Sequence, residues 1–127
     1  MNYSYKKQLH TSFEDAVEKT KAMLAEGGFG VLTEINVKST LKNKLNVDYD
    51  NYLILGACNP PFAYQALKAE KEIGLFLPCN IIVYSDNDKI FVSTILPMIA
   101  MGMINNSKLR EIAARIEEKL KKVIDTV

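Results

Sequence analysis

The feature that most constrains the fold is a nearly continuous apolar run from Tyr52 to Cys58, which Pro60 and Pro61 close. Such a run is typical of a strand that is covered on both faces. Proline is tolerated in the first turn of a helix and not deeper, so a helix is expected to begin here and to reach about Glu72. The segment therefore predicts a buried strand that is followed at once by a helix.

Four more strands can be predicted from the pattern of the sequence. Pro78–Ser85 and Lys89–Leu96 are separated by an acidic turn, Asp86-Asn87-Asp88, with the spacing and turn chemistry of a β-hairpin. Asn2–Gln8 and Phe29–Val37 show the alternation of apolar and polar residues that half-buried strands require. In the latter, the residues expected on one face are Phe29, Val31, Thr33, Ile35 and Val37.

Two long helices are expected as well. The first helix has Thr11 or Ser12 as its N-cap and ends at Gly27-Gly28. The last helix has Asn106 or Ser107 as its N-cap and reaches Asp125. The polar stretch at residues 38–51 predicts a short helix and a loop. Hairpin-linked strands with helices on the other side indicate an α+β sandwich, in which an antiparallel sheet carries its helices on one side.

Size and charge narrow the possible functions. A chain of 127 residues has the size of one domain, so residues 1–127 are expected to form a single domain. Its net charge is +1 and its lysines are interleaved with acids, whereas nucleic-acid and anionic-membrane binding favour a basic excess. No segment approaches the ~20 apolar residues of a membrane span, and the first ten residues do not resemble a signal peptide. We therefore expect a cytoplasmic protein with reduced cysteines that binds neither nucleic acid nor a membrane.

The two cysteines of the chain each precede an asparagine and lie beside proline, as Cys58-Asn59 and Cys79-Asn80. Because one cysteine ends a strand and the other begins one, antiparallel pairing would bring them to the same edge of the sheet. Close thiols could form a disulfide reversibly or share a soft metal, and the start of the helix at Pro60 would lower a thiol pKa. The alternative is packing, because free cysteine is among the most buried residue types.

The asparagines have two interpretations too. Asparagine at a chain reversal commonly bonds to nearby backbone, which is a structural role. The functional alternative is that Asn59 and Asn80 face one cleft and recognise a small polar ligand, with Tyr64 leaning over it from the next helical turn. The sequence leaves both alternatives open.

Other motifs favour structural roles. Met98, Met101 and Met103 have a spacing that could hold Cu(I), but methionine more often fills gaps in a core or an interface. His10 is the single histidine and lies near a helix cap. Phosphate-loop, hydrolase-elbow and zinc motifs are absent from the sequence, so neither a cofactor nor a metal is expected.

The block from Leu55 to Tyr84 resembles the signature of the domain-of-unknown-function 302 family of small prokaryotic proteins. The family pattern is Gly-Ala-Cys-Asn-Pro, then Ala and Ala-Leu on a helix, then Leu-Pro-Cys-Asn and an apolar strand. In this chain the pattern falls on Gly56, Ala57, Cys58, Asn59, Pro60, Ala63, Ala66, Leu67, Leu77, Pro78, Cys79 and Asn80.

The resemblance implies an α+β fold similar to that of the TATA-binding protein, with one strand, one helix, four strands and a helix, often associated as a dimer. It implies no activity. The residue before Pro97, often acidic in the family, is Leu96 in this chain.

The first hypothesis for function is therefore a homodimeric, non-enzymatic domain whose helical or Met-rich surface forms the dimer contact. It would bind a small molecule at a site made of Cys58, Asn59, Cys79, Asn80 and Tyr64. The second is a thiol-based redox or copper-type soft-metal protein. The third, an enzyme with a cysteine nucleophile, has only His10 as a possible imidazole base.

Overall fold

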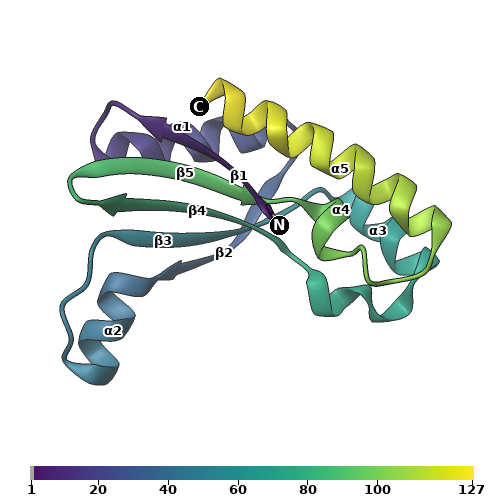
Figure 1. Cartoon of the computed structure of the whole chain (residues 1–127), viewed down its shortest axis with the longest axis horizontal. Helices are drawn as coiled ribbons and strands as arrows, with labels where there is room; N and C mark the ends of the chain where they lie inside the picture. Colours follow the sequence, from purple (N-terminus) through teal and green to yellow (C-terminus); the bar gives the residue numbers. More distant parts are fainter. Residues whose placement is uncertain (1) are drawn as a thin grey trace.

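The computed structural model describes residues 2–127 and shows one five-stranded antiparallel sheet in the order β1-β5-β4-β3-β2 (Figure 1). The strands are β1 (Ser4–Leu9), β2 (Gly30–Asn36), β3 (Tyr52–Cys58), β4 (Cys79–Asp86) and β5 (Lys89–Ile95). The helices are α1 (Phe13–Glu26), α2 (Val37–Leu45), α3 (Pro60–Ala69), the 3-10 helix η1 (Lys71–Phe76), α4 (Pro97–Ala100) and α5 (Ser107–Thr126). The predicted α+β class and antiparallel sheet are confirmed.

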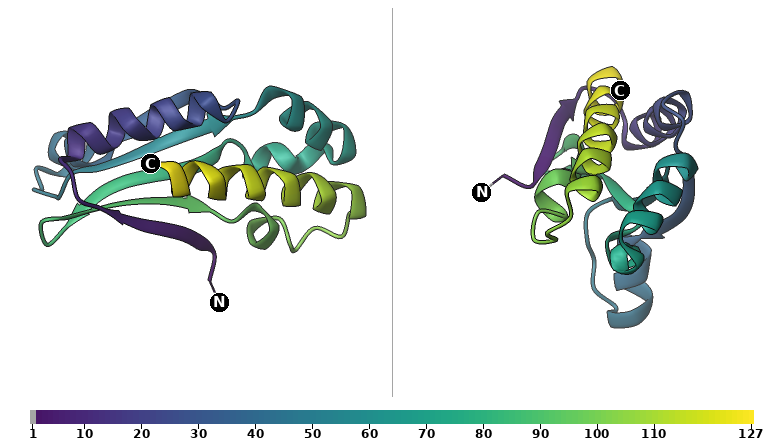
Figure 2. Two further views of the ribbon diagram at one scale, coloured as in Figure 1. Left: turned by 90° about the horizontal axis from the view of Figure 1, so that it is seen from above. Right: turned by 90° about the vertical axis from the view of Figure 1, so that its right-hand side faces the viewer.

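The two long helices, α1 and α5, lie side by side on one face of the sheet, as predicted (Figure 2). The Ser12 side chain accepts a hydrogen bond from the amide of Asp15 (3.1 Å), and the Asn106 side chain accepts one from the amide of Leu109 (3.0 Å). Of the two residues predicted as N-cap of each helix, the structure thus selects Ser12 for α1 and Asn106 for α5. Each helix within residues 2–127 is too short or too polar to cross a membrane.

The core lies between this helical layer and the inner face of the sheet. On β3 the buried positions include Leu53, Leu55 and Ala57, which alternate as one face of a strand requires. Opposite them, α5 buries one continuous apolar stripe: Leu109, Ile112, Ala113, Ile116, Leu120, Val123 and Ile124.

The prediction that β3 is covered on both faces is wrong, because the helices cover one face only. Tyr52 and Ile54 lie on the other, open face and are half-buried. A row of aromatic rings gives partial cover there: Tyr84 stacks between Tyr52 and Phe91, with ring centroids 5.3 Å apart on each side. Near β3 the open face of the sheet thus carries apolar and aromatic side chains without being covered by a helix.

The predicted alternation of β2 is wrong beyond Val31. Val31 lies opposite the buried Ala57, but the register shifts before Thr33, which lies opposite Gly56, and Ile35 then lies opposite Ile54. This β-bulge moves Thr33 and Ile35 to the open face, whereas Glu34 faces the helices and pairs with Lys21 of α1 (2.8 Å). After Asn36 the chain forms α2, the predicted short helix, which buries no residue and projects beyond the sheet (Figure 1).

Candidate functional site

The pairing of β3 with β4 brings the two Cys-Asn dipeptides to the same end of the sheet. Ala57 lies opposite Cys79 and Gly56 lies opposite Asn80, so Cys58 follows directly beyond the last pair. The two segments therefore meet at a common edge.

Both cysteines line a cavity of about 20 Å³ between the sheet and the helices. A space of this size holds about one water molecule. Asn59, at the start of α3, also contributes to the lining, and the remaining walls are Phe29, Ala57, Ala63, Leu77, Pro78 and Ile116. The cavity is thus too small for an organic ligand.

Both cysteines are free thiols, but their exposure differs. Cys58 is half-buried, whereas Cys79 is only 5% exposed. Burial, and to a lesser extent the neighbouring Cys58, raises the pKa of the Cys79 thiol to about 11. Cys79 is therefore protonated at neutral pH, which is the unreactive form of a cysteine.

Asn59 occupies the N-cap position of α3, yet its side chain forms no capping hydrogen bond. Its carboxamide approaches the turn after α1, where a Cβ atom on Gly28 would lie 3.4 Å from Asn59 Nδ2. Gly28 has a φ of +85°, a conformation that glycine adopts without strain. Asn59 thus lies between the start of α3 and this turn.

Asn80 points to the opposite side of the sheet from Cys79, because neighbouring residues of a strand face opposite ways. It is exposed on the open face, where it lines two adjoining depressions of about 290 Å³ and 150 Å³. The larger is otherwise lined by Leu75, Phe76, Leu77, Pro78, Ile95 and Ala100, and the smaller by Tyr3, Ser4, Ile82, Ser93, Thr94 and Ile95. The structure thus places the two predicted asparagines in different cavities.

Pro78 separates these two environments, since it lines both the cysteine cavity and the larger depression. The Leu77–Pro78 peptide bond is cis. Pro78 packs closely on Gly56 of the neighbouring strand, where a Cβ atom would lie 2.7 Å from Pro78 Cγ. Only glycine fits at this position of β3.

Tyr64 lies outside both the cysteine cavity and the depressions beside Asn80. Its side chain is 64% exposed on α3, and the ammonium group of Lys68 lies 4.6 Å from the centre of its ring. The structure therefore does not place Tyr64 with the other predicted site residues.

The methionines and the histidine considered in the sequence do not come together in one site either. Met101 is buried in the core, whereas Met98 and Met103 are exposed. His10 is exposed where β1 meets α1, at the predicted position. Within residues 2–127, no three His, Cys, Asp or Glu side chains lie together as a metal site would require.

Sequence reasoning missed the apolar walls of the larger depression. Leu75 and Phe76 belong to η1 and lie between the predicted helix end near Glu72 and the strand predicted from Pro78. The sequence gives little indication of these walls, because the depression forms only when η1, β4, β5 and α4 are folded together.

Comparison with known proteins agrees with this architecture. The model of the family "Domain of unknown function DUF302" matches residues 5–127. A crystal structure of an uncharacterized conserved protein DUF302 from Bacillus stearothermophilus superimposes with a TM-score of 0.93 at 32% sequence identity, and the alignment covers 99% of this chain and 98% of that one. No curated protein matches the chain. The chain therefore belongs to the DUF302 family, as the resemblance of its Cys-Asn motifs implied.

Proposed function

We propose that this protein binds a small, mostly apolar molecule with one hydrogen-bonding group, in the depression beside Asn80 on the open face of the sheet. The observation that carries the proposal is the composition of this depression. The side chains that line it are apolar apart from Asn80, and polar backbone atoms form part of its surface. Small-molecule sites typically combine an apolar lining with a few polar groups that orient the ligand.

The size of the depression supports the same function. It measures about 290 Å³ and adjoins a second hollow of about 150 Å³ through Asn80 and Ile95. Ligand pockets start at roughly 300 Å³. The cysteine cavity of about 20 Å³ falls far below this range. These sizes support a ligand site on the Asn80 side of Pro78 over one in the cavity that the cysteines line.

A thiol-based redox function is the alternative, favoured by the cavity that Cys58 and Cys79 share. The raised pKa of Cys79 opposes it, because a thiol attacks other groups far more slowly than a thiolate. His10 is not among the residues that line this cavity, so it is not placed to act as a base for either cysteine. Ligand binding without catalysis is the better-supported function.

Association as a homodimer in the cytoplasm is part of the proposal. The segment 32–49 exposes five large apolar side chains, each by 46–67%: Leu32, Ile35, Leu45, Val47 and Tyr49. At roughly 100 Å² apiece they supply much of the about 800 Å² that each partner contributes to a standard interface. This segment includes the helix α2 and is a stronger candidate for the contact than the Met-rich surface, although Met98 and Met103 are also exposed. Light scattering after gel filtration tests it, with a Leu32→Ser/Leu45→Ser variant expected to be monomeric and the wild type dimeric.

Binding beside Asn80 can be tested with indole, para-cresol and hexanamide as probes, followed by NMR chemical shifts of the backbone amides. At least one probe is expected to shift Asn80 and Ile95 and to leave Glu34 unchanged. Asn80→Leu removes a hydrogen bond worth about 1 kcal/mol, so the affinity should fall about fivefold to tenfold. The matched variant Asn59→Leu changes an asparagine outside the depression and should retain binding. Equal losses in the two variants, or no shifts at Asn80, would refute the proposal.

A further inference from the structure

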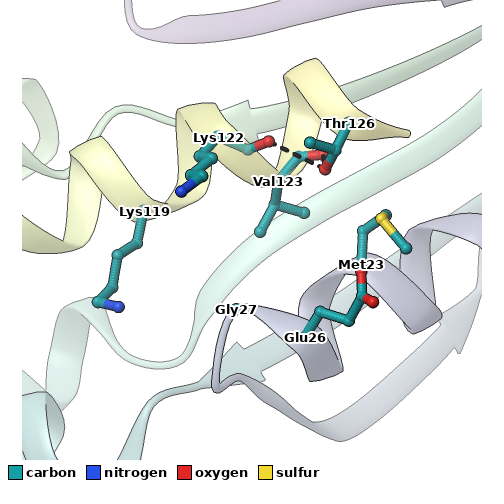
Figure 3. A pocket seen from close by; sticks show the side chains of 7 residues that line it. All are labelled: Met23, Glu26, Gly27, Lys119, Lys122, Val123 and Thr126. Carbon is teal, nitrogen blue, oxygen red and sulfur yellow. Dashed lines mark hydrogen bonds between the residues drawn. The ribbon is translucent and has the colours of Figure 1, made fainter.

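A second groove, on the opposite side of the sheet, lies between the end of α1 and the C-terminal half of α5 (Figure 3). It measures about 220 Å³. Met23 and Gly27 of the α1 side and Val123 of α5 give it an apolar floor. None of these residues contributes to the depression beside Asn80, so the groove is a separate site.

Gly27 keeps the groove open. Its φ of −81° is accessible to any residue, so backbone conformation does not require glycine there. A Cβ atom on Gly27 would nevertheless make a tight contact with Val123, at 3.2 Å from its Cγ2 atom, so Val123 would have to shift by a few tenths of an ångström. A side chain at this position would extend into the space between the two helices.

Glu26 forms the rim on the α1 side, in an electrostatically unfavourable position. It lies in the last turn of α1, which has no basic residue, and the C-terminus of a helix carries a partial negative charge. A carboxylate at this end is repelled by the helix and attracts a cation. The ion pairs found within residues 2–127 are Lys21–Glu34, Lys42–Asp48 and Lys121–Glu117, so Glu26 takes part in none of them.

Two ammonium groups form the opposite rim. Lys119 and Lys122 are three residues apart on α5, so their side chains lie on the same face of the helix. Figure 3 shows both on the α5 side of the groove, with Glu26 on the α1 side. Neither lysine belongs to one of the ion pairs of the described chain. The nearby Thr126 hydroxyl already donates to the carbonyls of its own helix.

From this arrangement we infer that the groove binds a zwitterion of amino-acid size with an apolar side chain. The ligand ammonium would pair with Glu26 and the end of α1, and its carboxylate with Lys119 and Lys122. Its side chain would lie on Met23 and Val123. The groove thus presents a carboxylate on one rim and two ammonium groups on the other, an arrangement that matches a molecule carrying both charges.

The experiment uses L-leucine as the probe, with leucinamide, which lacks the carboxylate, and N-acetyl-leucine, which lacks the ammonium group. In an NMR titration, leucine is expected to shift the backbone amides of Gly27 and Val123. The two analogues should bind at least fivefold more weakly, and added salt should weaken the binding of leucine because the rim is exposed.

Variants separate this site from the one proposed beside Asn80. Glu26→Gln and Lys122→Gln should each weaken leucine binding at least threefold. Glu18→Gln and Lys108→Gln, which change the same residue types elsewhere on α1 and α5, should leave it unchanged, as should Asn80→Leu. The inference is overturned if leucine shifts neither Gly27 nor Val123, if either analogue binds as tightly as leucine, or if the control variants lose as much affinity as those of the rim.

Discussion

Pro78 packs against Gly56 across the junction of β3 and β4, and this contact separates the two environments of the Cys-Asn motifs. Pro78 lines both the cavity that Cys58 and Cys79 also line and the depression beside Asn80. The close contact between Gly56 and Pro78 therefore helps to position the walls of both the cysteine cavity and the depression beside Asn80.

Replacing Gly56 by alanine should destabilise the protein by about 2 kcal/mol, the typical cost of overpacking a filled site. The new Cβ atom would meet both Pro78 Cγ and the hydroxyl oxygen of Thr33. Urea unfolding measures the change. Gly74→Ala is the matched control, because no atom lies within 4 Å of a Cβ atom there, and its effect should stay within about 0.5 kcal/mol. Equal effects of the two substitutions would show that the contact between Gly56 and Pro78 is not tight.

The two thiols should differ in their rate of modification. Cys58 is half-buried, whereas Cys79 is buried and its pKa is raised to about 11. At pH 8, Ellman's reagent is therefore expected to modify one thiol of the native protein and both thiols in denaturant. Cys58→Ser should abolish the native reaction and Cys79→Ser should leave it unchanged. Rapid modification of Cys79 in native Cys58→Ser protein would contradict the buried position of this thiol.

The same raised pKa predicts a loss of stability at alkaline pH. The folded state holds the Cys79 proton up to a pKa of about 11, whereas the unfolded chain releases it near the ordinary value of 9. Stability is therefore fully present below pH 9 and is lost progressively as the pH rises toward 11, by about 1.4 kcal/mol at pH 10.

Urea unfolding at pH 8 and pH 10 measures this loss, and comparison with Cys79→Ala removes the contributions of tyrosines and lysines that titrate in the same range. The wild type should lose more stability than the variant over this interval. If both lose the same amount, Cys79 does not contribute to the alkaline destabilisation.

The features that could be predicted from sequence depend on local chemistry. The turn between β4 and β5 is an example, because Asn87 and Asp88 adopt positive φ angles of 50° and 65°, which their residue types tolerate better than most. The caps of α1 and α5 are local too, since each asparagine or serine side chain reaches an amide three residues away. The meeting of the two Cys-Asn segments followed from antiparallel pairing alone.

The features that were missed depend on contacts between distant segments. The bulge in β2 arises where Thr33 meets Gly56, and nothing in the alternating residues of β2 marks it. The direction of Asn80 could be inferred only once the register of β4 was known, because a shift of one residue reverses the two faces of a strand. The apolar run of β3 suggested cover on both faces because neighbouring aromatic rings, and not helices, partly cover its open face.

Asn106 should stabilise the protein through three side-chain hydrogen bonds, and substitutions can separate the cap of α5 from the bonds to the end of α3. Its side-chain oxygen caps α5, and its amide group donates to the carbonyl of Ala69 (2.8 Å), which ties the end of α3 to the start of α5. Asn106→Ala removes the cap, the bond to Ala69 and the longer bond to Glu70 Oε1, and should cost about 2 kcal/mol in urea unfolding.

Asn106→Asp is the informative companion to this substitution. Aspartate caps a helix as well as asparagine does, but it cannot donate to Ala69, and it would place a second carboxylate near Glu70, whose Oε1 lies 3.5 Å from Asn106 Nδ2. The aspartate variant should therefore lose about 1 kcal/mol, and part of this loss should be recovered when Glu70 is also changed to Gln. An aspartate variant as stable as the wild type would show that the cap alone accounts for the role of Asn106.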